Sequence, residues 1–212
     1  MPLRNDGEAF FFDRCRHTGR DTWSDLMKKT GTKTLLDGKG VDRALSRLTH
    51  EILEKNKGAA EIVLVGIASG GVPLSQVIRR KIQVIEGVEV PAGFVDITFY
   101  RDDLARAGYQ ARMKRTEIPF SIDEKKVILV DDVLYTGRTI RAAMDALVDF
   151  GRPRNIQLAV LIDRGHRELP IRADFVGRNV PTSRSETVVV RVEGTPEEWS
   201  VSLREDPTGK GE

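Results

Sequence analysis

The sequence has very little cysteine, with one residue, Cys15, among 212. A single cysteine excludes a disulfide within the chain and a cysteine-rich zinc site. No apolar run approaches the roughly 18 residues of a transmembrane helix. Arg4 is soon followed by Asp6 and Glu8, which is not the pattern of a secretory signal. These absences predict a soluble protein of a reducing compartment, and we expect a cytoplasmic location with no membrane partner.

The sequence also lacks a dominant charge, because 34 basic residues face 32 acidic residues. Residues 1–36 hold seven basic and five acidic groups and account for the whole excess, whereas residues 37–212 hold 27 of each. A globally basic surface for nucleic acid is therefore not supported, and any such binding needs a local patch.

Several motifs are missing as well. Neither G-x-x-x-x-G-K-[ST] nor G-x-G-x-x-G occurs, which disfavours P-loop NTPases and dinucleotide-binding proteins. His166-Arg167-Glu168 lacks the P-C-x-x-C segment that completes a zinc deaminase site. Ser69 does not lie in a nucleophile elbow, because Ile67 takes the place of the first glycine.

What the sequence does contain is an alternation of strands and helices. Apolar residues repeat at helical spacing from Val41 to Leu53, after Asp37 as a predicted cap and before a stop signal at Asn56-Lys57-Gly58. Apolar runs typical of buried parallel strands occupy residues 62–67, 94–99, 127–130 and 156–162, with helices predicted over 74–82 and 139–150. This pattern predicts an α/β fold with a mostly parallel central sheet flanked by helices.

We divide the chain into three parts. Residues 1–36 are predicted to be a weakly structured extension, and residues 37–193 a single domain. Residues 175–180 and 187–192 are predicted as short strands of a C-terminal cap, and residues 194–212 as a polar tail. The long charged segment 101–120 has the character of a mobile functional loop.

The strongest motif is the run VILVDDVLYTGRT, from Val127 to Thr139. It predicts a buried strand that ends in Asp131 and Asp132, followed by a turn that opens a helix. Ligands of open α/β sheets bind at the carboxyl ends of the strands, and a helix N-terminus suits a phosphate. Two adjacent carboxylates can accept hydrogen bonds from the vicinal hydroxyls of a ribose. An isolated Asp-Asp pair is more often two solvated charges, but the length of the run favours a binding site.

This run closely resembles the phosphoribosyl pyrophosphate (PRPP) signature of type I phosphoribosyltransferases. Residues 96–104, 143–177 and 179–186 further resemble the PyrR family, which combines pyrimidine operon attenuation with uracil phosphoribosyltransferase activity; the resemblance spans roughly Thr34 to Glu193. It implies the type I phosphoribosyltransferase fold with a small C-terminal hood, and the conversion of uracil and PRPP to UMP and pyrophosphate. It also implies Mg²⁺ held mainly by PRPP, with no metal ligands from the protein.

The resemblance assigns roles to residues. Asp131 and Asp132 would hold the ribose hydroxyls and Arg101 would reach the pyrophosphate from the loop that closes over the site. The base would lie under the hood near Asp163, Phe175 and Val176. The remaining PRPP-binding positions are Ser69, Gly70, Gly71, Tyr135, Thr136, Gly137, Arg138 and Thr139. The family pattern has Thr-Arg-Gly where this chain has Ser69-Gly70-Gly71, so the missing arginine predicts weaker catalysis or a retuned loop.

The same resemblance implies a second face that binds leader mRNA of the pyrimidine operon under the control of UMP or UTP. On the predicted helix from Val41 the polar side lies opposite the apolar stripe, which by itself is typical of a solvated helix face. The resemblance makes it part of an RNA surface, with the residues Arg43, Ser46, Arg47, His50, Arg167, Arg172 and Arg178. The family forms homodimers and larger homo-oligomers.

Two alternatives remain open from the sequence. One is an RNA-binding attenuator with weak or lost catalysis, because of the change at Ser69-Gly70-Gly71. The other is a phosphoribosyltransferase for another base that binds no RNA.

Overall fold

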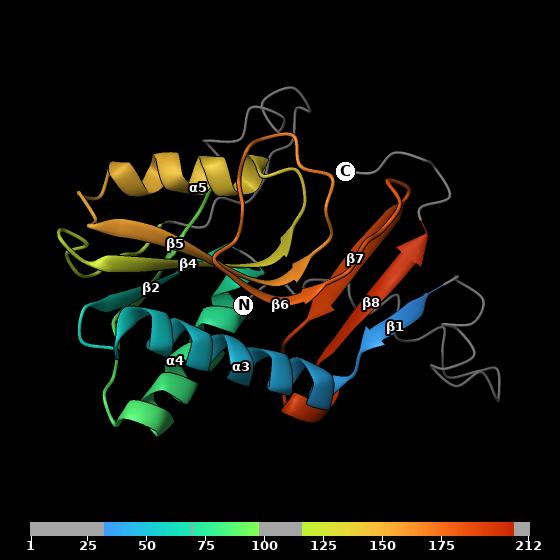
Figure 1. The fold of residues 1–212 in the computed structure, drawn as a ribbon, viewed down its shortest axis with the longest axis horizontal. Helices are drawn as coiled ribbons and strands as arrows, with labels where there is room; N and C mark the ends of the chain where they lie inside the picture. The colour runs from blue at the N-terminus through green and yellow to red at the C-terminus, as the bar shows by residue number, and fades with distance from the viewer. Residues whose placement is uncertain (1–31, 69, 98–115, 206–212) are drawn as a thin grey trace, which may run out of the picture.

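The computed structural model describes residues 32–68, 70–97 and 116–205. Strands and helices alternate along the chain to form a central sheet, and a second sheet joins a strand from the start of the described residues to strands that follow the last crossover (Figure 1). The elements are β1 (Lys33–Leu36), α3 (Gly38–Asn56), β2 (Ile62–Ile67), α4 (Gly71–Glu86), β3 (Ala92–Val95), β4 (Lys126–Leu134), α5 (Arg138–Val148), β5 (Asn155–Asp163), β6 (Phe175–Asn179), β7 (Glu186–Arg191), a 3-10 turn η2 (Pro196–Glu198) and β8 (Ser200–Glu205).

The central sheet has five strands in the order β3-β2-β4-β5-β6. All of its pairings are parallel, so the carboxyl ends of the strands meet at one edge. β4 lies in the middle and pairs with β2 on one side and β5 on the other. The predicted α/β fold with a parallel sheet is confirmed.

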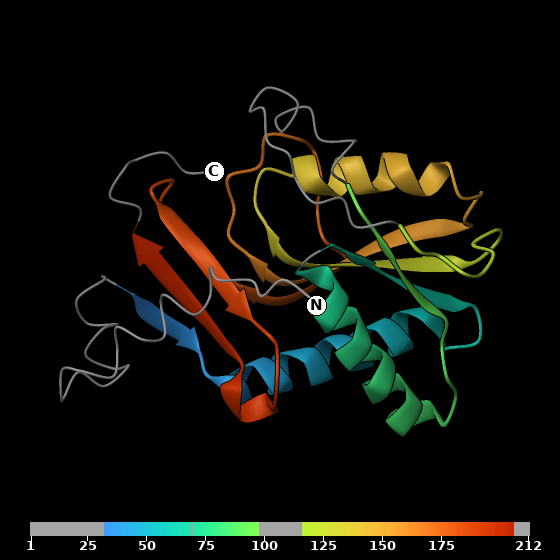
Figure 2. The same cartoon turned by 180° about the vertical axis from the view of Figure 1, so that it is seen from behind.

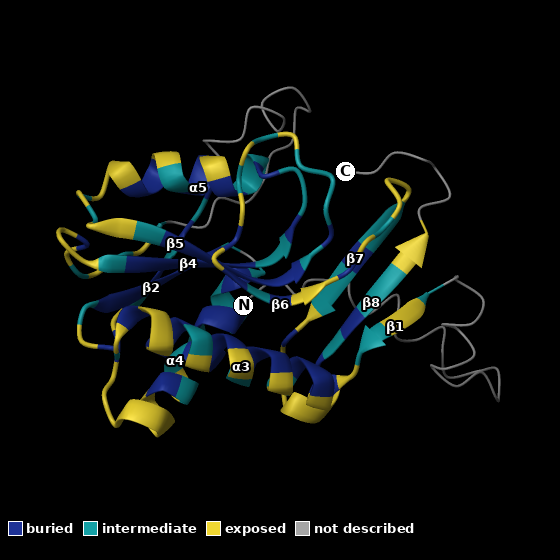
Figure 3. Ribbon diagram, in the orientation of Figure 1, coloured by how far each residue is buried: buried dark blue, intermediate teal, exposed yellow. Residues whose placement is uncertain are grey.

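Helices cover both faces of this sheet, with α3 and α4 on one face and α5 on the other (Figures 1 and 2). The side chains of β4 alternate between the two cores, with Ile128 and Val130 toward α3 and α4, and Val127 and Leu129 toward α5. Figure 3 shows the result, buried strands between helices whose outer faces are exposed.

Helix α3 begins and ends where the sequence predicts. The Asp37 side chain accepts a hydrogen bond from Gly40 N at 2.8 Å, which satisfies one free N–H of the first turn. Lys57 takes the left-handed conformation after the last turn, and Gly58 N donates to Leu53 O. The apolar side of α3 therefore packs on the sheet, as the spacing of its apolar residues predicts.

The hood differs from the prediction. It is an antiparallel sheet in the order β1-β8-β7, so residues 33–36 and 200–205, expected in a weakly structured extension and a polar tail, are paired strands. Trp199 and Val201 are buried and join the core beneath α3. β6, expected in the cap, is instead the edge strand of the central sheet, parallel to β5.

The physical reason is that β1, β6 and β8 have only 4, 5 and 6 residues, and β1 and β6 show no alternation of apolar and polar residues. Such segments gain their backbone hydrogen bonds from a partner strand that is distant in sequence, and local periodicity does not reveal that partner.

Among the described residues, no helix is both long and apolar enough to cross a membrane.

Candidate active site

The two acidic residues of the predicted motif lie at the carboxyl edge of the central sheet, inside β4 rather than after it. Asp131 is only 5% exposed, and Asp132 is half-buried. Asp132 N donates to Asp131 Oδ1 at 3.0 Å, and Val133 N donates to Asp132 Oδ1 at 2.8 Å. These bonds fix both carboxylates against the backbone of the strand end.

The Gly70-Gly71 pair brings the start of α4 against this strand end. A Cβ atom at Gly70 would overlap the Asp132 carboxylate, and a Cβ atom at Gly71 would overlap Val130 O. Gly71 is therefore required by close packing against the backbone, whereas at Gly70 the obstacle is the carboxylate end of the Asp132 side chain, which a larger residue would push aside. A side chain at position 70, such as the family's arginine, requires the acidic pair to be arranged differently.

The predicted phosphate loop, residues 135–139, follows β4 and opens α5. Gly137 has φ +93°, a left-handed conformation that favours glycine, and precedes the first residue of α5. Thr136 O accepts hydrogen bonds from Glu168 N at 3.0 Å and Leu169 N at 3.2 Å. The outer side of the loop is therefore held by the segment that follows β5, and its N–H groups and the helix N-terminus are suited to an anion.

Arg167 lies in that segment, and its guanidinium binds main-chain oxygens beside the phosphate loop. It donates to Tyr135 O at 2.8 Å, Gly165 O at 3.1 Å and Ile171 O at 3.1 Å, and forms an ion pair with Asp163. The structure thus places this predicted RNA contact at the carboxyl edge of the sheet, with its guanidinium bonded to Tyr135 O.

A residue that the sequence reasoning missed is Arg164. Its side chain is buried, and its guanidinium lies over the Tyr135 ring, 4.1 Å from the centroid. It also donates to hood residues: Thr182 Oγ1 at 3.0 Å, Ser183 O at 2.9 Å and Glu186 O at 2.6 Å. Burial lowers the pKa of Arg164, and the nearby Tyr135 and Glu186 act in the opposite direction. No spacing rule singles out this arginine, because its partners come from two segments that lie on either side of it in the sequence and are distant from each other.

A cavity of about 330 Å³ lies beyond the ends of β5 and β6. It is lined by Asp163, Arg164, Gly165, His166, Asn179, Val180, Pro181 and Thr182. Of the three predicted base contacts, only Asp163 is among these. Phe175 is 3% exposed in the core beneath α3, and Val176 packs toward α5 on the other face of β6.

The predicted RNA residues fall into two groups. Arg43 and His50 are exposed on α3, and neither has an ion-pair partner within the described ranges. Arg47 donates to the main-chain oxygens of Val176 and Gly177, and Ser46 Oγ accepts from Lys81 at 2.9 Å.

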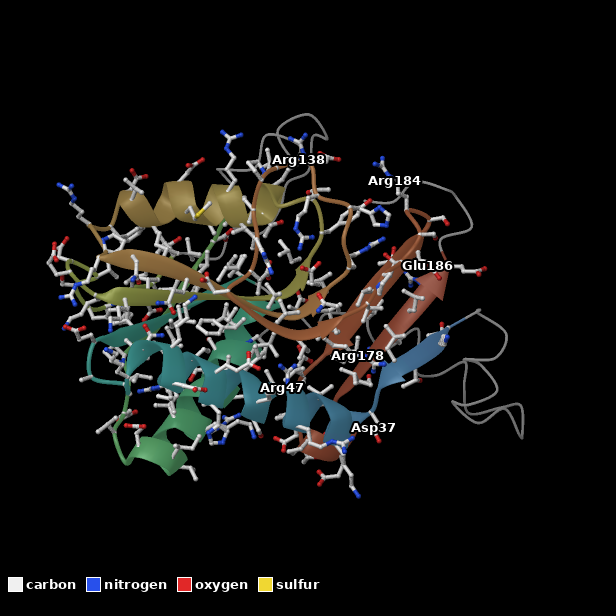
Figure 4. The ribbon with its side chains drawn as sticks, viewed as in Figure 1. Asp37, Arg47, Arg138, Arg178, Arg184 and Glu186 are labelled. Carbon is white, nitrogen blue, oxygen red and sulfur yellow. The ribbon has the colours of Figure 1, made fainter. Side chains whose placement is uncertain are left out.

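Arg178, next to these carbonyls on β6, donates to Leu35 O at 2.8 Å. Figure 4 shows Arg47 and Arg178 on one side of the molecule and Arg138 on the other, at the start of α5. Arg172 is exposed two residues before Asp174, which pairs with Lys55 in the last turn of α3. α3 thus carries Arg43, Ser46, Arg47 and His50 beside β6, which carries Arg178. Arg172 lies in the segment before β6, and Arg167 lies at the carboxyl edge of the sheet. Two predicted site residues, Ser69 and Arg101, lie outside the described residues.

The partly buried carboxylate of Asp132 leads to a testable prediction. Burial raises the pKa of its carboxyl above the ordinary 3.8, against the opposing hydrogen bonds from Val133 and Asp131. The folded state therefore holds this proton more tightly than the unfolded chain, a stabilisation that is present below the ordinary pKa and lost as pH rises through the folded value.

We expect Asp132→Asn to increase the free energy of unfolding at neutral pH, with the gain disappearing near about pH 4. Urea unfolding at both pH values measures this, with exposed Glu54→Gln as the control. A variant that is less stable than wild type at neutral pH would contradict the assignment.

Comparison with known proteins places this geometry in a family. Residues 31–194 match the model of the phosphoribosyl transferase domain. The chain is 62% identical over 170 residues to the bifunctional protein PyrR of Geobacter sp. (strain M21), covering 80% of this chain and 96% of that protein. It is 59% identical over 171 residues to the bifunctional protein PyrR of Thermus thermophilus, covering 81% of this chain and 94% of that protein.

Solved structures agree on the fold. A hypoxanthine phosphoribosyl transferase of Trypanosoma cruzi superposes with a TM-score of 0.65 at 20% identity, over 89% of this chain and 96% of that chain. One from Staphylococcus aureus gives 0.62 at 20% identity, over 86% and 97%. At this identity the likeness concerns the fold, whereas the curated relatives and the matched domain decide the family. The chain belongs to the PyrR family of phosphoribosyltransferases.

Proposed function

We propose that the protein transfers the phosphoribosyl group of PRPP to uracil, forming UMP and pyrophosphate, and that uridine nucleotides control its binding to leader mRNA. The observation that carries the enzymatic half is the placement of Asp131, Asp132 and the phosphate loop 135–139 at one edge of the sheet, within a member of this family. We further propose that β1 and β8, which lie outside the predicted bounds 37–193, belong to the same phosphoribosyltransferase domain as the central sheet.

In this proposal Asp131 and Asp132 accept hydrogen bonds from the ribose hydroxyls of PRPP, and the N–H groups of residues 135–139 bind its 5′-phosphate. A ring nitrogen of uracil forms a bond to the anomeric carbon while the carbon–oxygen bond to pyrophosphate breaks, and the proton of that ring N–H is released to the leaving pyrophosphate or to water. The ribose carries positive charge in the transition state, and the fixed carboxylates are placed to stabilise it. The main contribution of the protein is to hold both reactants in line.

Mg²⁺ fits this site, because carboxylate oxygens are the ligands that it prefers, and Asp132 is only half-buried at the edge. Bound together with PRPP, the ion would offset the charge of the departing pyrophosphate. Asp131 and Asp132 would orient the ribose of PRPP, and the ion would be held mainly by PRPP itself.

For the base, the cavity beyond β5 and β6 is a better site than the three predicted contacts, of which only Asp163 lines it. We propose that uracil enters there beside Asp163 and the main chain of residues 179–182, where peptide groups can read its N–H and C=O edge. Phe175 and Val176 then support β6 from within the cores. Ser69 and Arg101 keep their proposed roles at the pyrophosphate.

The regulatory half is supported by the common face of α3 and β6, where Arg43, His50 and Arg178 are exposed and Arg47 lies against β6. A cluster of cations and hydrogen-bonding groups suits the phosphates and unpaired bases of an RNA hairpin. We therefore propose Arg43, Ser46, Arg47, His50, Arg172 and Arg178 as the RNA surface and assign Arg167 to the active site. A homodimer or larger assembly remains our expectation.

The acceptor experiment tests the enzymatic proposal. Purified protein with PRPP and Mg²⁺ is expected to consume uracil in preference to hypoxanthine, guanine and orotate, measured as nucleotide and pyrophosphate formation. Transfer to another base would make the protein a different phosphoribosyltransferase. Absence of any transfer, together with nucleotide-dependent hairpin binding, would favour the attenuator without catalysis.

The packing of Gly70 on Asp132 generates a second prediction. Gly70→Ala is expected to displace the Asp132 carboxylate and lower kcat/KM for PRPP by about 10²-fold, since small misplacements in a site have effects of that order. Gly70→Arg should likewise lower the rate. Steady-state kinetics decide, with exposed Gln83→Ala in α4 as the control. An increase in activity on introducing the arginine would show that this residue had been lost from a decayed site.

The RNA surface predicts a separate effect. Arg172→Ala is expected to weaken binding of the operon leader hairpin and to flatten its log–log salt dependence by about one unit, as expected for the loss of one phosphate contact. Uracil turnover should stay at the wild-type rate. Exposed Arg152→Ala, which is not among the proposed contacts, serves as the control. Filter binding over a salt series measures the affinity for the hairpin and its salt dependence. An unchanged slope would show that Arg172 is not part of the RNA surface.

A further inference from the structure

Arg164 joins two parts of the site that have different tasks. On one side its guanidinium stacks on the ring of Tyr135, the first residue of the phosphate loop. On the other side the same group donates to Thr182 Oγ1 and to the carbonyl oxygens of Ser183 and Glu186, which lead into the hood. The phosphate loop and the hood therefore share one side chain.

The main chain and a neighbouring residue strengthen this connection. Arg164 N donates to Leu134 O at 3.1 Å, so its own backbone is fixed to the end of β4. His166 Nε2 lies 2.6 Å from Thr182 O, and its ring meets the Tyr135 ring edge-on at 6.0 Å. His166 has φ +59°, a conformation that a non-glycine residue adopts rarely and that the surrounding contacts must support.

The chemistry of the arginine suits this position. A guanidinium is planar, so its face can stack on an aromatic ring while its edges donate in fixed directions to several oxygens. Arg164 is only 5% exposed, and its guanidinium donates to a hydroxyl and to main-chain carbonyls. These contacts hold two segments together, and a movement of either segment disturbs them.

We propose that Arg164 is a positioning residue that makes residues 135–139 and residues 182–186 one binding unit, so that the phosphate and the base of a nucleotide bind cooperatively. The inference rests on the proposed function, because it takes the phosphate to bind at the loop and the base to bind beside the hood. Through Arg164 residues 182–186 are held against the loop, so the base binds to a surface that is already in place beside the bound phosphate.

The test compares UMP with ribose 5-phosphate, which lacks the base, by titration calorimetry on the full chain. Arg164→Gln is expected to weaken UMP binding by about tenfold or more, within the usual range of coupling between sites, and to leave ribose 5-phosphate within about threefold. Arg164→Lys should also fail to restore UMP binding, because an ammonium group can neither stack on Tyr135 nor reach three acceptors in one plane. Exposed Arg154→Gln, ion-paired with Glu61, is the matched control.

Tyr135 supplies the second arm. Tyr135→Phe keeps the aromatic face and should keep the coupling, whereas Tyr135→Leu should lose it. The double variant Arg164→Gln with Tyr135→Leu should be no weaker toward UMP than either single variant, because both changes break the same connection.

Equal losses for UMP and ribose 5-phosphate in Arg164→Gln would mean a general structural role and would overturn the proposal, as would unchanged UMP binding. Failure of the proposed function is distinguishable. If wild-type protein uses another base, the same comparison is made with the nucleotide of that base. If wild-type protein binds neither nucleotide nor ribose 5-phosphate, both proposals are wrong.

Discussion

Parallel pairing of β4 on both of its edges is the constraint on which the rest of the structure depends. A strand with neighbours on both sides and helices on both faces must be apolar throughout its length, as Val127 to Val130 are. Its direction then determines where the polar residues that follow must lie. Asp131 and Asp132 come at the carboxyl edge, next to the glycines at the start of α4.

Close approach at this edge has chemical consequences. Because Gly70 and Gly71 lack side chains, α4 begins directly against Val130 and Asp132. The acidic pair is thereby partly withdrawn from water, and the pKa of Asp132 is raised by that burial. Burial thus disfavours the ionised form of the Asp132 carboxyl, and pKa shifts of this kind cluster at functional sites.

The segment between β5 and β6 meets its hydrogen-bonding needs without regular secondary structure. Arg164 and Arg167 donate to main-chain oxygens of the phosphate loop, of their own segment and of the hood. Buried carbonyl groups need partners, and arginine can serve several at once. In the proposed function β6 therefore contributes to both sites. Its end borders the base cavity, and its carbonyls at Val176 and Gly177 accept hydrogen bonds from Arg47 of the RNA surface.

The sequence by itself determined the elements whose signal is local. Helix α3 with its Asp37 cap, the buried strands β2, β4 and β5, and the acidic pair before a phosphate loop all follow from periodicity and residue type within a short window. Resemblance to the family indicated the same site. Only the tertiary structure decided that β1 and β8 are strands, that Phe175 lies in the core, and that Arg164 and Arg167 both contact Tyr135. The reason is that each of these depends on partners far apart in the chain, and a local pattern carries no information about which distant backbone a side chain will meet.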